Sequence, residues 1–529
     1  MQQTNNNSIR TFAPLPVGIS DIAVILKNNM LYVDKTRFAY EMVKVPGKFF
    51  LSRPRRFGKS MLLSTFEEIF RGNKELFKDQ WIYNSQWDWQ VYPIIRLDFN
   101  VATTTDLVGY IMLQLQRVAT EYKVFDAAVF KQHTYDTYFR HLISMLHKTY
   151  KQPVAILIDE YDKPILDAID DINEAKKKRD ILKGFYTVMK GVDESLYFVF
   201  LTGVSRFSKV GVFSGLNNLQ DITLTSKYAD ICGYTQNDLE TVFKDYLIDV
   251  DRAKLKLWYN GYNFAGSDAQ KVYNPFDILL FLSNNKVYKN HWFGTGNPEF
   301  LIKLIQKNQY YFPNMEGITI EESDLSNFEV DNIALTTLLF QTGYLTIKET
   351  TTIGMQQAYV LGYPNLEVKA SLNDKLAAIG SNVEHKQANK SKLATCLSGS
   401  DLNGLSGIFK SYFASIPHDW YRNNHIHDYE GFYASIVYSY FCALGYNTVA
   451  EDTTNIGQID LTVDLPDKIL ILEFKLKKNG DAASAIQQIK DRRYADKYKA
   501  DNKPIYLVGV SFDPESRNVH DFISEIACV

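Results

Sequence analysis

The feature that most constrains the fold is a Gly-Lys-Ser tripeptide between a short apolar strand and a helix-like run. Residues 48–51 (KFFL) have the composition of a buried strand, and apolar side chains recur at helical spacing over residues 61–70. The tripeptide 58–60 lies at the junction, where the first backbone N–H groups of a helix attract anions. This order of strand, loop and helix predicts a phosphate-binding loop in a parallel α/β sheet.

The loop departs from the common pattern G-x-x-x-x-G-K-[ST] at its first position, where Arg53 replaces glycine. The second half of the pattern is kept. A lysine there reaches the β- and γ-phosphates of a nucleotide, and the hydroxyl of the next residue binds Mg²⁺. We therefore predict that Arg56, Gly58, Lys59 and Ser60 bind ATP, with Ser60 on its Mg²⁺.

A second strand supports the nucleotide site. Residues 154–158 (VAILI) are continuously apolar, as in a strand buried on both faces, and they end in Asp159 and Glu160. In this position Asp159 would hold Mg²⁺ and Glu160 would polarise the attacking water. The alternative is an acidic strand end that only faces solvent. Two further strands are expected at 92–99 and 196–203, with helices near 106–121, 136–150 and 174–190. Strands alternating with helices predict a doubly wound parallel sheet.

Two polar residues follow the last of these strands. Thr202 lies where a polar residue would sense the nucleotide, and Arg206 lies on the next loop. Arg206 would contact the γ-phosphate, in its own chain or in a neighbouring subunit. A loop arginine paired with a nearby acid is an equally good interpretation.

Near the C-terminus, two alternating runs predict a β-hairpin. Residues 458–464 (QIDLTVD) and 468–475 (KILILEFK) flank a turn centred on Pro466-Asp467. In this register Asp460 lies opposite Glu473, and Lys475 is on the same face as Glu473. The other face would collect the apolar residues Ile459, Leu461, Val463, Leu470, Leu472 and Phe474.

The acidic pair of this hairpin has a chemical interpretation. Two carboxylates one strand spacing apart can share a hard cation such as Mg²⁺, and a nearby lysine can orient water or stabilise charge on a phosphate. A surface hairpin with an accidental acid–acid–base cluster is the alternative. Like charges directly opposite each other destabilise a sheet, so the pair requires a neutralising partner.

The neighbouring segments add two residues to this cluster. Glu430 opens a helical stretch that stops at Gly445, and Gln488 lies in another helical stretch that leads to Tyr494. The order of these elements resembles the PD-(D/E)xK nuclease superfamily: a helix that carries an acid, a strand with Asp, a strand with Glu-x-Lys, and a helix with Gln. The resemblance implies metal and catalytic positions for Glu430, Asp460, Glu473 and Lys475, a role for Gln488, and a restriction-endonuclease-like α/β domain. Gln458 departs from the family, which often has Gly-Arg-x-Asp here.

The N-terminal half resembles the AAA-ATPase-like domain that precedes such a nuclease-like domain in many bacterial proteins, typically of Bacteroidetes and Clostridia. The resemblance is carried by residues 15–21 (LPVGISD), 32–36 (YVDKT), 53–60 (RPRRFGKS), 158–162 (IDEYD) and 202–207 (TGVSRF). The family commonly reads RPRRFGKS, so Arg53 is not anomalous within it. We expect a structural role for Asp34 and Lys35.

The middle of the chain is less informative. Aromatic-rich turns at 258–264 and 272–276 suggest a packed lid beside the nucleotide, with base stacking as an alternative. A helix and strand within 331–347 and a strand over 357–363 are compatible with a winged-helix-like element that binds DNA or covers the ATPase core. We predict an ATPase-like domain at 1–245, this helical or winged-helix-like region at 246–370, a polar linker at 371–400 and the nuclease-like domain at 401–529.

Length and composition set the remaining limits. A chain of 529 residues is too long for one ordinary core, and its net charge of −3 gives no global attraction to nucleic acid. No apolar run approaches the roughly 18 residues of a membrane span, and the N-terminus lacks a signal-peptide pattern. The four cysteines have no metal-ligand spacing. We expect a cytoplasmic protein without membrane contact, and a homo-oligomer formed through the ATPase domain is an open alternative.

Two functions remain at this point. The first is an ATP-hydrolysing protein coupled to a metal-dependent nuclease that uses Mg²⁺, or Mn²⁺, with DNA preferred to RNA. The second is a nucleotide-dependent switch whose C-terminal domain binds nucleic acid or protein without cleaving it. Retention of the whole acid–acid–lysine set favours the first, and Gln458 favours the second.

Overall fold

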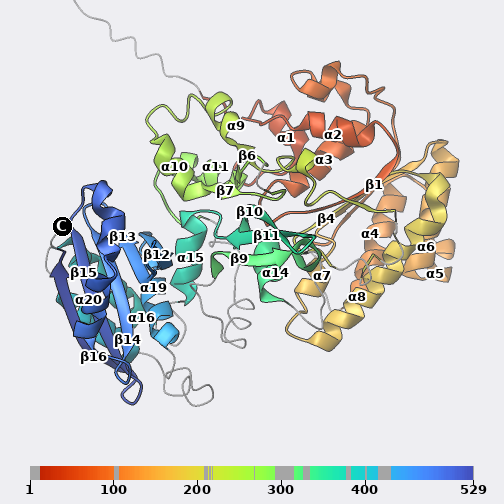
Figure 1. Cartoon of the computed structure of the whole chain (residues 1–529). Coiled ribbons are helices and arrows are strands. Elements are labelled where there is room, and N and C mark those ends of the chain that lie inside the picture. Colours follow the sequence, from red (N-terminus) through yellow and green to blue (C-terminus); the bar gives the residue numbers. More distant parts are fainter. Residues whose placement is uncertain are drawn as a thin grey trace, which may run out of the picture. The chain divides into compact units, whose positions relative to one another are not determined.

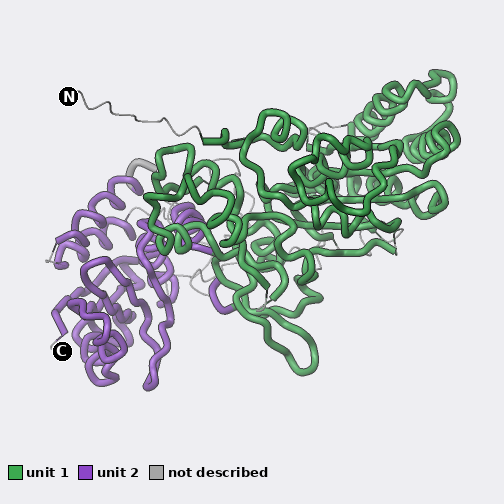
Figure 2. Tube along the Cα trace, turned by 90° about the horizontal axis from the view of Figure 1, so that it is seen from above, with its two compact units in different colours: residues 1–291, 318–364 green, residues 292–317, 365–529 purple. Residues whose placement is uncertain are grey.

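The computed structural model describes residues 12–100, 106–207, 212–213, 216, 218–266, 269–291, 315–325, 334–376, 383–399, 402–414 and 430–527. The chain divides into two compact units, coloured green and purple in Figure 2. Unit 1 covers residues 1–291 and 318–364, and unit 2 covers residues 292–317 and 365–529. Within the described residues, no helix combines the length and the apolar character needed to cross a membrane.

Unit 1 is built on a five-stranded parallel sheet with the strand order β2-β3-β4-β1-β5. Figure 1 labels two of its inner strands, β1 and β4. Its strands are β1 (Gly47–Ser52), β2 (Ile94–Asp98), β3 (Val154–Asp159), β4 (Leu196–Gly203) and β5 (Gln220–Asp221). Every residue of β3 is buried, as expected for a central strand covered by helices on both faces. The predicted parallel α/β sheet is confirmed.

Several helices of unit 1 begin at residues with recognisable capping chemistry. The side chains of Asp106, Asp126 and Asp171 accept backbone N–H groups at the starts of α4, α5 and α8. The α-helices are α1 (Ile22–Lys27), α2 (Thr36–Val43), α3 (Lys59–Phe70), α4 (Leu107–Glu121), α5 (Ala127–Gln132), α6 (Tyr135–Tyr150), α7 (Lys163–Leu166), α8 (Ile172–Thr187), α9 (Gln236–Thr241), α10 (Arg252–Tyr259) and α11 (Pro275–Ser283). The short 3₁₀ helices are η1 (Lys74–Phe77), η2 (Trp81–Asn84), η3 (Val188–Ser195) and η4 (Ser226–Tyr228).

Two small antiparallel sheets complete unit 1. The first has the order β6-β8-β7, with β6 (Tyr234–Thr235), β7 (Asn260–Tyr262) and β8 (Val272–Tyr273). Tyr259, Tyr262 and Tyr273 are fully buried, so these aromatic turns form core and expose no stacking surface through these rings. The second has the order β10-β11-β9, with β9 (Ile318–Glu321), β10 (Thr346–Ile353) and β11 (Gln356–Gly362). Two short helices, α13 (Glu322–Leu325) and α14 (Leu335–Gln341), lie between β9 and β10 in the chain. The helix and two strands expected here are present, and β9 adds a third strand.

Unit 2 contains a five-stranded mixed sheet with the order β12-β13-β14-β15-β16. β14 and β15 are parallel, and the other neighbouring pairs are antiparallel. The strands are β12 (Asn447–Thr453), β13 (Gln458–Asp464), β14 (Ile469–Leu476), β15 (Ile505–Asp513) and β16 (Asn518–Ile526). The helices are α15 (Leu366–Leu376), α16 (Val383–Ser398), α17 (Gly404–Ala414), α19 (Glu430–Ala443), α20 (Ala482–Asp491) and the 3₁₀ helix η8 (Tyr494–Asp501).

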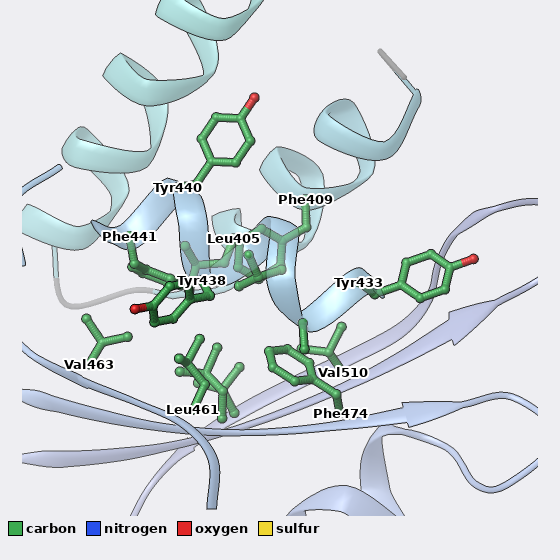
Figure 3. Close-up of a cluster of buried hydrophobic side chains, with 14 of the residues drawn as sticks. Leu405, Phe409, Tyr433, Tyr438, Tyr440, Phe441, Leu461, Val463, Phe474 and Val510 are labelled. Atoms are coloured by element: carbon green, nitrogen blue, oxygen red, sulfur yellow. The ribbon is translucent and has the colours of Figure 1, made fainter. Parts of the chain in front are cut away.

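Both faces of this sheet are covered. Figure 3 shows Leu461, Val463, Phe474 and Val510 of the sheet facing Tyr438 and Phe441 of α19 and Leu405 and Phe409 of α17. On the opposite face, Ile471 packs with Ile486 and Ile489 of α20 and with Tyr494. Helices on both faces of a mixed sheet agree with the predicted restriction-endonuclease-like class.

Two local expectations differ from the structure. Residues 371–400, predicted as a linker, include the end of α15 and all of α16. Leu393 and Leu397 of α16 are buried against the unit 2 core, and Lys386 and Lys390 of the same helix pair with Asp374 of α15. Ile459 was expected beside Leu461, but it lies in the cluster on the other face with Ile471.

Candidate active sites

The first site forms where β1 ends and α3 begins. Gly58 has a φ of 97°, in the left-handed region that glycine adopts without strain, and Lys59 is the first residue of α3. No side chain caps this helix start. Its first backbone N–H groups are therefore available to an anion, as a phosphate-binding loop requires.

Lys59 occupies the centre of this loop and is surrounded by oxygen atoms. Its side chain is only 3 % exposed, and its Nζ donates to the carbonyl oxygens of Arg53 at 3.1 Å and Pro54 at 3.2 Å. The same Nζ lies 3.5 Å from Oε1 of Glu160. The ammonium group is thus held in position before any nucleotide phosphate reaches it.

Acidic residues meet at the C-terminal ends of β2 and β3. Asp98 and Asp159 are paired in the register of the two strands. Burial raises the pKa of Asp159 to about 6, with further raising by Glu160 and Asp98, against a hydrogen bond from Ser60 and the charge of Lys59. Ser60 and Asp159 thus supply neighbouring oxygen ligands, which suit the Mg²⁺ of a bound nucleotide.

A cavity of about 340 Å³ opens beside the phosphate-binding loop. Arg56, Gly58, Lys59, Ser60 and Glu160 line it together with Pro16, Gly18, Ile19, Ser20, Ile25, Leu31, Tyr32, Val33, Lys35, Phe57, Met61, Leu62, Thr65, Ile231, Cys232, Gly233, Tyr234, Pro275, Phe276 and Leu279. Its volume lies within the range of small-ligand sites. The mostly apolar walls suit a flat base, and the loop at one end suits its phosphates.

Arg53, which replaces the first glycine of the common pattern, has a structural position. It is 1 % exposed and donates to the carbonyl oxygens of Ser52, Thr223 and Tyr228 at 2.8 to 3.0 Å. Its guanidinium carbon also lies 4.2 Å from the ring centre of Phe264. Burial lowers the pKa of Arg53 to about 10. This side chain ties the phosphate-binding loop to the segment that follows β5.

Thr202 and Arg206 are not among the described residues that line the cavity. Thr202 is buried near the end of β4, next to Leu51 of β1. Nε of Arg206 instead pairs with the Asp221 carboxylate, and its backbone N–H donates to Gln341 Oε1 at 2.9 Å. This ion pair is the alternative that sequence reasoning left open.

Lys35 is a cavity residue to which sequence reasoning assigned only a structural role. It lines the cavity, and its Nζ lies 3.0 Å from Asp238 Oδ2. Its neighbour Asp34 does act structurally, because its carboxylate accepts the backbone N–H groups of Thr36 and Trp81. No signal in the sequence marks this difference between Lys35 and Asp34, because both are charged residues at neighbouring positions. Only the cavity lining shows that Lys35 could contact a ligand.

The second site lies in unit 2, where β13 and β14 run side by side. Pairs from Leu461↔Leu472 to Asp464↔Ile469 confirm the predicted register, which places Asp460 opposite Glu473. The paired residues of β13 and β14 end at Leu461↔Leu472. Beyond them a side chain provides the hydrogen bond between the strands, because Asp460 Oδ2 accepts the backbone N–H of Phe474 at 2.7 Å. Glu451 on the adjacent strand β12 has a φ of 50°. This irregular backbone beside Asp460 explains why Ile459 and Leu461 lie on opposite faces of the sheet.

Glu473 is the most deeply buried acid of this site, at 1 % exposure. Its Oε1 accepts Lys475 Nζ at 3.2 Å and also Gln488 Nε2 from α20. Its Oε2 is buried without a hydrogen-bond partner among the described residues. Leaving a buried carboxylate oxygen unsatisfied is costly, so this atom marks a place for a cation or a proton.

Both carboxyl groups have raised pKa values. Burial and, after it, the charge of Asp460 raise the pKa of Glu473 to about 7, against the charge of Lys475. Burial also raises the pKa of Asp460 to about 6, with Glu430 and Glu451 adding to the increase, while the Phe474 N–H and Lys475 lower it. Two acids that resist ionisation together form a site that a divalent cation would stabilise.

Glu430 reaches the same strand from the start of α19. Its Oε2 accepts the backbone N–H of Leu476 at 3.1 Å, at the end of β14. No three His, Cys, Asp or Glu side chains in the described part of the chain are grouped closely enough to hold a metal ion together. The donors that fit Mg²⁺ are therefore the Asp460–Glu473 pair, which is sufficient because Mg²⁺ is often held by one or two carboxylates plus water and substrate phosphate.

Comparisons with known proteins match both regions. A family model described as "Predicted AAA-ATPase" matches residues 16–213, and one described as "PD-(D/E)XK nuclease superfamily" matches residues 428–522. The chain is 43% identical over 519 residues to "Uncharacterized protein in vnfD 5'region" of Azotobacter chroococcum mcd 1, covering 97% of this chain and 98% of that relative. No solved structure matches the chain.

Proposed function

Because the chain belongs to the family that joins a predicted AAA-ATPase domain to a PD-(D/E)XK nuclease superfamily domain, we propose that it is an ATP-dependent nuclease. It binds and hydrolyses ATP in unit 1 and cleaves phosphodiester bonds of nucleic acid, with DNA as the proposed substrate, in unit 2. The proposal includes a cytoplasmic location and Mg²⁺, or Mn²⁺, at both sites.

The observation that carries the nuclease proposal is the unsatisfied Oε2 of Glu473. This oxygen belongs to a buried carboxyl group, and the neighbouring carboxyl group of Asp460 also has a raised pKa. Because two adjacent negative charges repel each other, a bound cation would stabilise the ionised pair near neutral pH. A divalent cation held by this pair would supply Lewis-acid stabilisation and would lower the pKa of the attacking water.

The other polar residues of the site have distinct proposed roles. Lys475 places its ammonium beside Glu473, where it stabilises negative charge that develops on the scissile phosphate. Gln488 holds the Oε1 of Glu473, so the carboxylate keeps its orientation. Glu430 fixes the end of β14 through the Leu476 N–H, and its second oxygen can accept a hydrogen bond from water.

In unit 1 the proposed roles follow the contacts of the phosphate-binding loop. Lys59 exchanges part of its contact with loop carbonyls and Glu160 for phosphate oxygens, and Ser60 and Asp159 hold the metal ion of the nucleotide. Glu160, once released from Lys59, orients the attacking water. Thr202 remains a proposed nucleotide sensor on its position at the end of β4.

The experiment that tests the function is cleavage of labelled single-stranded DNA, double-stranded DNA and RNA by the full-length protein. Each substrate is tested in Mg²⁺ and in Mn²⁺, with and without ATP, beside Glu473→Ala and Lys59→Ala. We expect cleavage that Glu473→Ala abolishes and that ATP alters only when Lys59 is present. Cleavage that persists in Glu473→Ala would contradict the assigned site.

A second candidate function is a nucleotide-dependent switch whose C-terminal domain binds nucleic acid or protein without cleaving it. The observation in its favour is that Gln458, two residues before Asp460, is exposed and neutral, so it offers no charge to a phosphate. ATP hydrolysis that requires Lys59, without cleavage of any substrate, would support this function instead.

A further inference from the structure

One edge of α20 faces the carboxylate pair of unit 2. Gln488 lies on this edge, since its side chain donates to Glu473. Arg492 follows four residues later, and its backbone N–H donates to the Gln488 carbonyl oxygen at 3.1 Å, so the helical geometry continues to this residue. Residues four apart lie on the same face of a helix. Arg492 therefore extends from the same edge as the glutamine that contacts Glu473.

The guanidinium of Arg492 lies over the turn that leads into β13. Its Nη1 would be 2.7 Å from a Cβ atom built on Gly457, the residue before Gln458. The same Nη1 donates to the hydroxyl of Tyr494 at 3.3 Å, and that hydroxyl donates to the Gln458 carbonyl oxygen at 2.6 Å. Tyr494 is fully buried. Arg492 is thus held at the start of the strand that carries Asp460.

The charge of Arg492 is available to a ligand. The side chain is exposed, it forms no ion pair within the described residues, and its one hydrogen bond there is to Tyr494. A guanidinium has five N–H donors in a planar fork that matches phosphate oxygens. The four acids Glu430, Glu451, Asp460 and Glu473 outnumber the one lysine among them, Lys475, so a further cation favours the approach of a polyanion.

We infer that Arg492 is a phosphate-binding residue of the unit 2 site and supplies the positive charge that position 458 lacks. The inference rests on the proposed nuclease function and deepens it. The ligand is a phosphate of the nucleic-acid backbone next to the scissile bond. Because the contact is to the backbone, it adds affinity without selecting a base sequence.

The test is equilibrium binding of labelled single- and double-stranded DNA to the full-length protein across a series of salt concentrations. Ca²⁺ replaces Mg²⁺, because it accepts the same oxygen ligands and keeps the carboxylate pair neutralised. The variants are Arg492→Gln, Arg492→Lys and the matched control Arg493→Gln, which removes an equally exposed arginine one residue later. A double variant, Gln458→Arg with Arg492→Gln, moves the charge to the neighbouring strand.

We expect Arg492→Gln to weaken binding about tenfold and to reduce the salt slope by about one, since one phosphate contact is lost. Arg492→Lys should retain part of the affinity, Arg493→Gln should stay within about twofold, and the double variant should recover most of the loss. An unchanged salt slope in Arg492→Gln, or equal losses in Arg492→Gln and Arg493→Gln, would overturn the inference while leaving the nuclease proposal intact. No binding and no cleavage by the unaltered protein would instead reject both.

Discussion

The two sites of this chain balance their charges in opposite ways. In unit 1 the buried cation Lys59 sits among the carbonyl oxygens of Arg53 and Pro54 and the carboxylate of Glu160. In unit 2 the buried carboxyl group of Glu473 has one oxygen satisfied by Lys475 and Gln488, and its other oxygen has no hydrogen-bond partner among the described residues. The central charged group of the first site therefore has partners without a ligand, whereas the central acid of the second site has an oxygen left for one.

This difference indicates what each site is built to receive. A lysine that already has acceptors can exchange them for phosphate oxygens at little cost, so unit 1 suits a nucleotide that comes and goes. A carboxylate oxygen without a partner gains a full interaction when a cation arrives, so unit 2 depends on its metal ion.

The largest effect is expected from Glu473→Ala. Removal of the central acid should reduce nucleic-acid cleavage by about 10³-fold or more, because metal binding and water activation are lost together. ATP hydrolysis in unit 1 should be unchanged. The measurement is a side-by-side assay of both activities, with Glu515→Ala as a control that removes an exposed acid. Equal loss of both activities would show that the two sites are not separable in this way.

Lys59→Ala should reduce ATP binding and hydrolysis by about 100-fold or more, because the β- and γ-phosphates lose their charged partner. Binding of Mn²⁺ at unit 2 should persist. Titration calorimetry with ATP and with Mn²⁺ measures the two effects, and the exposed Lys27→Ala serves as the control. ATP affinity that survives in Lys59→Ala would place the nucleotide elsewhere.

Arg53→Met should lower the free energy of unfolding of unit 1 by about 2 to 4 kcal/mol, because three buried carbonyl oxygens lose their donor. Arg55→Met, at an exposed position of the same loop, should change it by less than about 0.5 kcal/mol. Chemical denaturation followed by tryptophan fluorescence compares the two variants. Similar stability in both would refute the clamping role of Arg53.

Metal affinity at unit 2 should fall with acidity. The Glu473 carboxyl has a pKa of about 7 and Asp460 one of about 6, so protons compete with the cation below neutral pH. Mn²⁺ affinity should fall about tenfold between pH 7 and pH 6, and more steeply below pH 6. Calorimetric titrations at pH 8, 7, 6 and 5 measure the fall, and affinity independent of pH would contradict it.

The same pKa shift predicts a stability effect of known sign in the absence of metal. The folded state keeps a proton on Glu473 up to about pH 7, whereas the unfolded chain loses it near the ordinary value of 4.5. The free energy of unfolding should therefore fall as the pH rises through this interval, by up to about 3 kcal/mol. Glu473→Gln should remove the contribution of Glu473 and leave the smaller one from Asp460, whose pKa is raised to about 6.

Much of the fold follows from patterns that are local in the chain. Four of the five strands of the parallel sheet were predictable because continuous apolar runs such as 154–158 mark them, and helices were predictable because their apolar residues recur at helical spacing. The two-residue strand β5 was missed because it is too short to carry a pattern. The hairpin register in unit 2 was predictable because alternation and the turn centre together leave one pairing that hides the apolar residues. The helix α16 was missed because it buries only one narrow side.

The amino-acid sequence alone indicates which backbone segments form strands, helices and a phosphate-binding loop, and which acids face each other across one hairpin. The partners of individual side chains emerge only from tertiary packing: Arg53 on the carbonyls of Thr223 and Tyr228, Arg206 on Asp221, and Arg492 over Gly457. The physical reason is that backbone preference depends on near neighbours, whereas burial and hydrogen-bond partners depend on packing between segments far apart in the chain. The sequence alone does not distinguish a charged side chain that anchors a loop from one that contacts a substrate.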